Sequence, residues 1–377
     1  MKNRYKIAIL TLYYHNYNYG GLLQAYALQM VLSKAFGYAD QISYQLRSGY
    51  SSQYPSFLLS FVEIGHFIKI LPWRIKFRKT IKKMNKFANS ISHTRVVTAK
   101  TISNLIHEYN IFVCGSDQIW NPVGWQPTLF LNFVPNSKIK ISYAASIARD
   151  NLTTDQVEYI RKYVKDFSAI SVREKKSADM LNRIYPQLDV QYMPDPVFLL
   201  EESEWKKFVR SKSSTETFIF GYFLGEDVVN REKALAFSKK LGIKIIFASH
   251  LSFSQYKWEK KHQNKICSPL GVEDFLNNIA NASLVLTDSF HAAAFSAIYR
   301  TPFYVLPRFS LHDKNSMNSR IFDLVEELHI PNRFTENLNE DFEWTGEEKE
   351  NLSANINRLR IRGIQYLEKS LCVTKGV

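Results

Sequence analysis

The chain has 377 residues, enough for about two domains of ordinary size, because a single hydrophobic core rarely serves more than about 250–300 residues. Its 45% hydrophobic and 22% charged residues exclude a largely disordered protein. The formal net charge of +14 indicates an anionic partner, which is a phosphate-bearing small molecule, a nucleic acid or an acidic lipid.

The cysteines and the apolar runs indicate in which compartment of the cell the protein is found. Cys114, Cys267 and Cys372 show no CxxC spacing, so we expect neither a disulfide framework nor a metal site, and a reducing cytoplasm fits best. The sequence has no run of 18 or more apolar residues that would predict a transmembrane helix. The segment from Met1 to Leu12 lacks the small-residue cleavage site of a secretion signal.

Strand-like and helical stretches alternate in the first half of the chain. An apolar run, a turn containing two glycines and a helical pattern ending at Gly37 come first, and a further helix spans 173–186. The predicted strands of this half are Tyr5 to Tyr14, Ile111 to Gly115, Ile139 to Ala145 and Asp166 to Val172.

The pattern begins again after Pro194. There the run PDPVFLL and the polar residues that follow it favour a connector between two domains. Beyond the connector, Asn230 to Leu241 and Ala292 to Tyr299 read as helices. The predicted strands of this half are Phe218 to Phe223, Lys244 to Ser249, Leu284 to Thr287 and Phe303 to Leu306.

This alternation predicts an α/β fold with two doubly wound, Rossmann-like domains that face each other across a cleft. We place the first domain at 1–195, the second at 196–345, and a C-terminal helix at 346–377 that packs back on the first domain. Ligands of such sheets bind beyond the carboxyl ends of the strands, so the loops there are the candidate site.

A basic amphipathic insertion near 57–87 breaks the alternation. Its apolar stretch FLLSFVEIGHFIKILPW precedes the basic stretch RIKFRKTIKKMNKF. Such a helix either lies in the interface of an anionic membrane or is a solvated surface helix. The cations of the basic stretch are Arg74, Lys76, Arg78, Lys79, Lys82, Lys83 and Lys86.

Three loops that follow predicted strands in the first domain carry candidate ligand groups. Backbone amides in the first loop either receive an anion at the start of a helix or belong to a structural turn. The second loop either faces the cleft or supplies a helix cap. Arg173, in the third, either binds a carboxylate or phosphate or forms a surface salt bridge. The first loop contains Asn18, Tyr19, Gly20 and Gly21, and the second Gly115, Ser116 and Asp117.

The strongest local signal is TDSFHAAAFSAIY, in which an apolar strand leads through a short polar turn into an alanine-rich helix. His291 falls near the start of that helix, where the helix dipole favours a neutral ring or eases proton release, as general acid or base catalysis requires. Asp288 and Ser289 either orient the ring and bind substrate or cap the helix.

Basic residues after the last predicted strand are candidates for clamping an anion. Arg308 and Lys314 follow the strand, and Arg320 lies near the start of the next helical pattern. The alternative for each is an ordinary loop cation.

Six segments in order, NYGGLLQAYALQ, VCGSDQIWNP, ISYAASI, SVREKKS, PDPVF and TDSFHAAAFS, resemble the polysaccharide pyruvyl transferase family over about residues 6–330. The resemblance implies a GT-B-like fold and transfer of pyruvate from phosphoenolpyruvate to two sugar hydroxyls, as a cyclic ketal. It implies no cofactor, with His291 near the reacting carbon and Arg173 holding the donor. Many members have arginine and leucine before the histidine, where this chain has Ser289 and Phe290, so Arg308, Lys314 and Arg320 become the candidate donor clamps.

The resemblance also implies a partner and a place in the cell. Acceptors in such pathways for exopolysaccharide or capsular polysaccharide are often glycans on polyprenyl diphosphate, which suits a cytoplasmic protein at the inner face of the plasma membrane. Two rival functions stay open: a GT-B glycosyltransferase that uses a nucleotide sugar, and a non-catalytic assembly protein at the membrane surface. Nucleic acid is not expected as a partner, because the sequence lacks a recognised binding motif.

Overall fold

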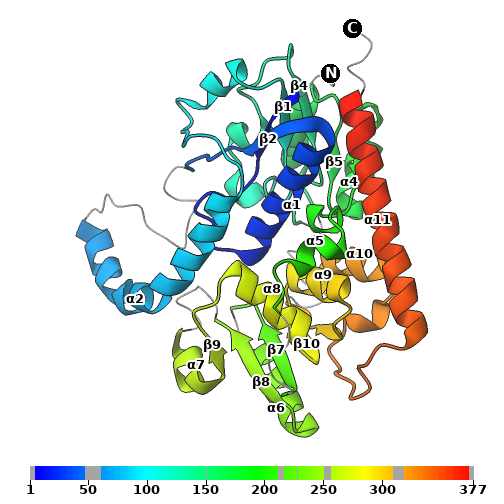
Figure 1. Ribbon diagram of the computed structural model, residues 1–377. Coiled ribbons are helices and arrows are strands. Elements are labelled where there is room, and N and C mark those ends of the chain that lie inside the picture. The colour runs from blue at the N-terminus through cyan, green and yellow to red at the C-terminus, as the bar shows by residue number, and fades with distance from the viewer. Residues whose placement is uncertain are drawn as a thin grey trace.

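The computed structural model describes residues 5–46, 61–149, 151–210, 216–226, 228–249, 256–308 and 318–372, and only the backbone at 61–74, 76, 256 and 372. Figure 1 shows two parallel sheets, one above the other, with helices around both. Within the described part of the chain, no helix is long and apolar enough to cross a membrane.

The upper sheet has the strand order β2-β1-β3-β4, and all its pairs are parallel. Helix α1 connects β1 to β2, and Gly37 both ends the helix and begins the strand, at a φ of 133° that favours glycine. The sequence pattern missed β2 because GYADQ lacks an apolar run. The elements are β1 (Tyr5–Leu10), α1 (Tyr19–Phe36), β2 (Gly37–Gln41), β3 (Ile111–Cys114) and β4 (Ile139–Ser142).

The lower sheet has the order β11-β10-β7-β8-β9 and is also parallel, so its strands end at a common edge. Its strands are β7 (Phe218–Tyr222), β8 (Lys244–Ala248), β9 (Ile266–Cys267), β10 (Leu284–Thr287) and β11 (Phe303–Val305). Its helices are α6 (Val229–Leu241), α7 (Tyr256–Lys261), α8 (Val272–Asn281), α9 (Phe290–Tyr299) and α10 (Ser319–Glu327).

Short elements complete the chain. The strand predicted from Asp166 is only two residues long as β5, which pairs with the equally short β6 and forms one isolated parallel bridge, from Val172 to Ala145. The remaining regular elements are α3 (Thr154–Val164), β5 (Ser171–Val172), α4 (Lys175–Ile184), β6 (Gln191–Tyr192) and α5 (Glu202–Lys206). The 3₁₀ helices are η1 (Ile102–His107), η2 (Pro122–Gly124), η3 (Pro127–Phe130), η4 (Pro186–Leu188), η5 (Pro196–Phe198), η7 (Gln263–Lys265) and η8 (Pro331–Arg333).

The predicted connector after Pro194 is not an exposed linker. Its residues Val197, Phe198 and Trp205 are almost fully buried, and η5 contacts α1, α9 and α11. The apolar side chains of this segment therefore belong to the core between the two sheets, which a reading based on proline and the polar residues beyond it could not show.

The basic insertion forms α2 (Phe61–Ser90), which is anchored on both sheets' helices. Phe77, Met84 and Phe87 point into the core beside α1. The Thr80 hydroxyl accepts a hydrogen bond from the amide of Leu270, just before α8. The described half of this helix is thus held firmly along one face.

Helix α11 (Gly346–Cys372) runs along one side of the molecule, beside both sheets (Figure 1). Its Tyr366 hydroxyl donates to the carbonyl of Ser142 on β4, at 2.9 Å. Toward its start, Ser353 accepts a hydrogen bond from Arg300, which caps α9. The helix therefore ties the two halves together.

A substitution at Gly363 tests how tightly α11 is packed against the rest of the protein. A methyl group there would lie 2.4 Å from the Tyr143 hydroxyl and 2.5 Å from a Leu199 methyl. We expect Gly363→Ala to lower the free energy of unfolding by about 1–3 kcal/mol, measured by chemical denaturation. The control Gly346→Ala lies in the same helix with open space around it, and should be neutral or slightly stabilising. Equal changes in the free energy of unfolding for Gly363→Ala and Gly346→Ala would contradict the tight packing around Gly363.

Candidate active site

A buried carboxylate, that of Asp195, forms the centre of the candidate site. It follows β6 and caps η5, accepting a hydrogen bond from the amide of Val197 at 3.1 Å. Its Oδ2 atom lies 2.6 Å from Arg173 Nη1, 3.3 Å from Ser116 Oγ and 3.4 Å from His291 Nε2. Residues from four distant segments of the chain thus meet at one carboxylate.

The charges around Asp195 keep it ionised. Burial alone would raise the pKa of this carboxyl, but the attraction of His291 at 3.4 Å and of Arg173, which also donates a hydrogen bond, outweighs burial and lowers it well below its usual range. A carboxylate with 1% exposure is stable only when it is paired in this way. Asp195 is therefore a fixed negative charge shared by two basic groups.

Arg173 follows β5 and is 3% exposed, so it does not form the surface salt bridge considered as its alternative. Burial opposes its charge, but Asp195, Glu174 and Asp117 together raise its pKa. Its guanidinium carbon lies 4.8 Å from the centre of the Phe290 ring. Its Nε and Nη2 atoms have no hydrogen-bond partner among the described residues, so they are available to a ligand.

Glu174, at the N-cap of α4, is fully buried. Its carboxylate accepts hydrogen bonds from the Ser146 hydroxyl and from the amide of Ile147. It lies 3.9 Å from Arg173 Nε, too far for a hydrogen bond. Because it fixes the loop after β4 beside Arg173, Glu174 supports the site from behind.

His291 lies in the first turn of α9, which begins where β10 ends. The Ser289 side chain caps this helix by accepting from the amide of Ala292 at 3.5 Å, so Ser289 serves as the cap. The His291 ring packs on the first turn of α1, where a methyl group on Gly20 would lie 2.0 Å from Nδ1. The glycine is thus needed for close approach, and Nε2 is the nitrogen on the Asp195 side.

The glycine turn does not offer its amides to an anion in this structure. The Asn18 side chain caps α1 and accepts from the amides of Gly20 and Gly21, at 2.9 and 3.3 Å. Tyr19 donates its hydroxyl to the carbonyl of Leu270 and stacks on Phe275. The structure therefore favours the structural-turn interpretation of this loop, with Tyr19 joining the two sheets.

The loop after β3 places Ser116 in contact with the Asp195 carboxylate, with Gly115 and Asp117 on either side of it. Ser116 donates to Asp195. Gly115 packs where a methyl group would lie 3.2 Å from Thr11. Asp117 has a φ of 64°, and its carbonyl accepts from the amides of Ile119 and Ser146. The Asp117 charge is close enough to raise the pKa of Arg173.

Asp288 holds a loop and a cation rather than facing open space. Its two carboxylate oxygens accept from the amides of Leu224 and Gly225, at 2.6 and 2.8 Å. Arg308 donates through Nη2 to the Asp288 carbonyl at 2.8 Å and lies 3.3 Å from its Oδ1. Arg308 Nε is buried without a hydrogen-bond partner in the described part of the chain.

Arg320 brings a third guanidinium to the site from the start of α10. It is 7% exposed, and its Nε lacks a hydrogen-bond partner within the described ranges. Burial and repulsion from Arg173 and Arg308 lower its pKa to about 9. The three arginines are thus close enough to repel one another, while Lys314 lies outside the described residues.

The chemistry available to this site is that of cations, a histidine and carboxylates. Among the described residues, no group of three or more His, Cys, Asp or Glu side chains is arranged to hold a metal ion. Four guanidinium nitrogen atoms, two on Arg173 and one each on Arg308 and Arg320, are buried without acceptors. Leaving such donors unpaired costs free energy, which an anionic ligand would recover.

The family model for polysaccharide pyruvyl transferases matches residues 18–308, which include Asp195, Arg173, His291 and Arg308. The chain belongs to the polysaccharide pyruvyl transferase family. A comparison with curated protein sequences finds no significant match. The family resemblance read from the six sequence segments is therefore confirmed by an independent description of the family.

Solved structures show the fold. UDP-GlcNAc 2-epimerase from Neisseria meningitidis, bound to UDP-GlcNAc, has a TM-score of 0.53 at 9% identity, covering 98% of this chain and 100% of that one. MnaA from S. aureus, in a co-structure with UDP, has a TM-score of 0.51 at 14% identity and covers 96% and 90%. The N-terminal domain of Candida albicans trehalose-6-phosphate phosphatase has 0.52 at 11%, covering 99% and 99%. The pyruvyl transferase chain thus has the predicted α/β, GT-B-like fold.

Sequence reasoning missed the central residue of the site. Asp195 lies between two prolines in a segment interpreted as a connector, although that segment also belongs to the family resemblance. Phe290 was noted only as a departure from the family pattern, yet its ring covers the Arg173 guanidinium. A charged residue flanked by prolines and followed by the apolar run VFLL was the available signal for Asp195.

Inorganic phosphate tests whether the arginines form an anion site. Because the pKa of Arg320 is lowered to about 9, holding its guanidinium charged in the folded protein costs free energy at neutral pH. That cost falls only as the pH rises past about 9, where the guanidinium loses its proton. At neutral pH, phosphate at several times its Kd should stabilise the protein by about 1 kcal/mol, seen as a higher Tm.

Two variants make the phosphate experiment specific. Arg320→Ala should lose most of the phosphate-induced rise in Tm, because one of the three cations is gone. Arg183→Ala removes an exposed arginine on α4 and should respond like the wild type. An equal rise in Tm for all three proteins would contradict an anion site at Arg320.

Proposed function

We propose that the protein transfers pyruvate from phosphoenolpyruvate to two hydroxyls of a sugar, as a cyclic ketal on a cell-surface polysaccharide or its lipid-linked precursor. The supporting observation is the set of buried, unpaired guanidinium donors beside the pair His291 and Asp195. Phosphoenolpyruvate carries a carboxylate and a phosphate, both of which suit arginine. The family membership supports the same class of reaction.

The donor is held, in this proposal, by Arg173, Arg308 and Arg320. Their free nitrogens are hydrogen-bond donors in fixed planar groups, which match the oxygens of carboxylate and phosphate. Ser289 stands where many family members have arginine, and it is used as a helix cap. Arg320, which is repelled by the other two arginines, supplies a cation from α10 instead.

His291 acts as the general acid. The protonated ring gives a proton to the methylene carbon of the donor, which becomes a methyl group, and positive charge develops on the neighbouring carbon. The first sugar hydroxyl adds to that carbon and returns its proton to His291. The second hydroxyl then displaces phosphate, which leaves with the remaining proton, and the arginines stabilise the negative charge of the leaving group.

Asp195 is the positioning residue for this step. Its Oδ2 faces both His291 Nε2 and Arg173 Nη1, so one carboxylate sets the distance between the acid and the donor clamp. The Asp195 carboxylate lies 3.4 Å from His291 Nε2 and so attracts the positive charge that the ring carries as a general acid. Because Asp195 stays ionised, this support persists throughout the neutral pH range.

A glycan carried on polyprenyl diphosphate at the inner face of the plasma membrane is the acceptor that the family relationship favours, and no cofactor is needed for the reaction as written. The proposal includes a cytoplasmic location, which suits phosphoenolpyruvate as the donor.

The identity of the donor is tested first. Phosphoenolpyruvate should raise the Tm more than UDP-GlcNAc does, because its carboxylate and phosphate engage several arginines. With glycan extracted from the source cells, mass spectrometry should then find a pyruvate ketal, accompanied by release of phosphate. A larger stabilisation by UDP-GlcNAc, with sugar transfer and no ketal, would instead favour a glycosyltransferase.

His291→Gln isolates the proton donor. Glutamine keeps the hydrogen-bonding capacity of the side chain but cannot serve as a general acid, so we expect ketal formation at saturating phosphoenolpyruvate to fall by about 10²–10⁴-fold. Stabilisation by phosphoenolpyruvate should change little, since the arginines remain. Full ketal formation by this variant would remove His291 from the mechanism.

Asp195→Asn tests the positioning role through the pH profile. The neutral amide no longer attracts the positive charge of a ring 3.4 Å away, so kcat/KM should lose most at the basic end of the pH profile. Ser116→Ala removes a hydrogen bond to Asp195 without changing charge, and its profile should keep the wild-type shape. A uniform loss at every pH in Asp195→Asn would mean that Asp195 has only a structural role.

A further inference from the structure

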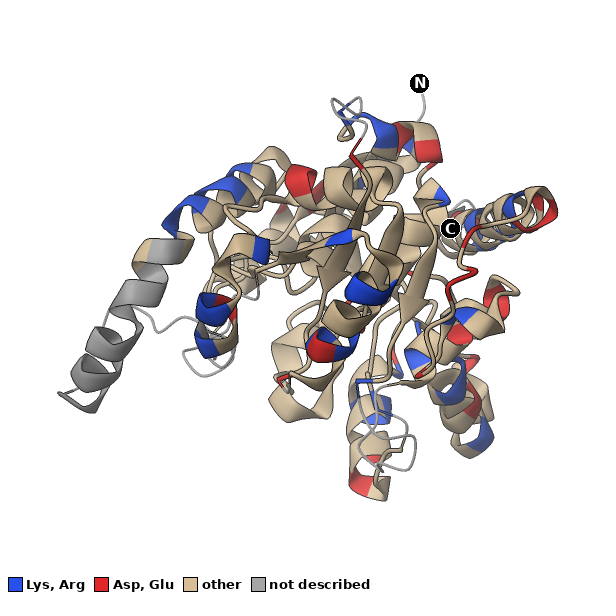
Figure 2. Ribbon diagram, turned by 90° about the horizontal axis from the view of Figure 1, so that it is seen from below, with Lys and Arg blue, Asp and Glu red and all other residues tan. Residues whose placement is uncertain are grey.

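The outward face of α2 carries a row of exposed cations. Counting along the helix, Ile75, Arg78, Lys79, Lys82 and Lys86 fall on one side, and all five are exposed. The opposite side, which includes Phe77, Met84 and Phe87, is buried in the core as described above. The cationic face therefore lies on the solvent side of a helix whose opposite side packs in the core, and Figure 2 colours the Lys and Arg positions along the described part of α2 blue.

These cations have no ion-pair partners among the residues that the structure describes. In the described part of the chain, none of Arg78, Lys79, Lys82 and Lys86 forms an ion pair. Lys83 is different, because its ammonium lies 2.6 Å from the Asp274 carboxylate and donates to the carbonyl of Pro269. Lys83 thus fastens α2 to the lower sheet, while the four others remain free to act on something outside.

The charge of this helix is large relative to the whole protein. Its 30 residues include eight basic residues and one acidic residue, a net of +7, which is half of the chain's +14. A helix that only needed solvation would more often mix the two signs. The one-sided composition favours an anionic partner.

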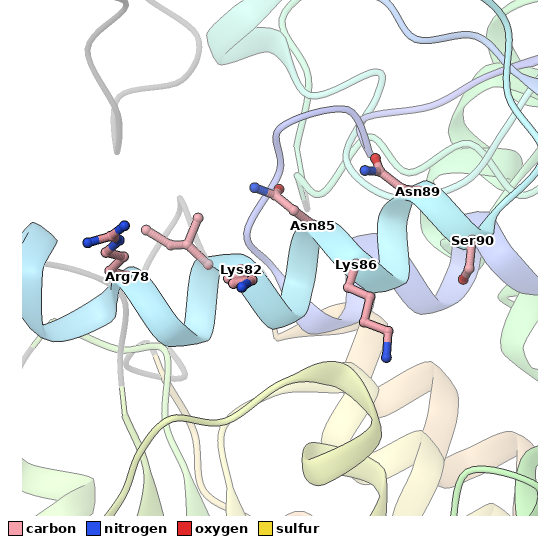
Figure 3. A pocket seen from close by; sticks show the side chains of 7 residues that line it. Arg78, Lys82, Asn85, Lys86, Asn89 and Ser90 are labelled. Carbon is pink, nitrogen blue, oxygen red and sulfur yellow. The ribbon is translucent and has the colours of Figure 1, made fainter.

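The arrangement of the side chains indicates the kind of anion. Arg78, Lys82 and Lys86, with Asn85 and Asn89, line a hollow of about 700 Å³ that is wide open to solvent. Figure 3 shows these side chains spreading outward along the helix instead of converging on one point. Such an array suits a broad charged surface better than a single small anion, which needs convergent donors.

We propose that this face of α2 docks the protein on an anionic lipid bilayer. The four free cations would lie at the level of the lipid phosphates, and Ile75, which is 67% exposed, would add apolar contact at the interface. This inference does not depend on the pyruvyl transfer reaction, because it rests on a surface remote in sequence from the catalytic groups.

Vesicle sedimentation of the full-length protein tests the docking face. The wild type should sediment with vesicles of phosphatidylcholine mixed with phosphatidylglycerol, and remain in solution with phosphatidylcholine alone. A variant with alanine at Arg78, Lys79, Lys82 and Lys86 should bind the mixed vesicles at least about tenfold more weakly. It keeps Lys83, so its Tm should match the wild type.

A second variant controls for total charge. Alanine at Lys233, Lys239, Lys349 and Lys369 removes four exposed lysines that form no ion pair among the described residues. This control should bind the mixed vesicles like the wild type. Equal binding by the two variants would overturn the proposal, as would a wild type that stays in solution with the mixed vesicles or binds phosphatidylcholine alone equally well.

Discussion

The burial of one carboxylate, that of Asp195, is the constraint on which the candidate site depends. A carboxylate taken out of water must be paired, and here the partners come from loops after β3, β5 and β10. The segments packed around η5, including α1, α9 and α11, enclose this group between the two sheets. The same interaction that makes Asp195 tolerable in the core therefore brings Arg173 and His291 together.

The candidate site also contains buried arginine nitrogens that have no hydrogen-bond acceptor among the described residues. Arg173 is satisfied on one nitrogen by Asp195, and Arg308 on one by Asp288, but their remaining buried nitrogens face no acceptor in the described structure. Arg320 adds a guanidinium whose charge is already disfavoured. A protein tolerates this arrangement when a ligand completes it, which connects the packing of the core to an anionic substrate. In the proposed function, Arg320 on α10 supplies the cation that many family members carry at the position of Ser289.

The alternation of strands and helices was predictable because it depends on local apolar periodicity, and Arg173 and His291 were found because they follow strands. Short strands such as β2 and β9 escaped, since their residues carry no run of their own. Asp195 and Arg320 could not be placed in the same way. Their importance arises from burial and from charges distant in sequence, and the proline-flanked Asp195 looked locally like part of a linker. The role of Gly20, which makes room for the His291 ring, likewise appears only in three dimensions.

The central claim is that Asp195 and His291 act as one unit, and a double-variant cycle on the rate of ketal formation tests it most directly. Asp195→Asn, His291→Gln and the double variant would be compared at saturating phosphoenolpyruvate. If Asp195 works through His291, the double variant should be about as slow as the slower single variant, as expected for residues that share one function. Losses that multiply would show that the two residues contribute independently, and would contradict the account.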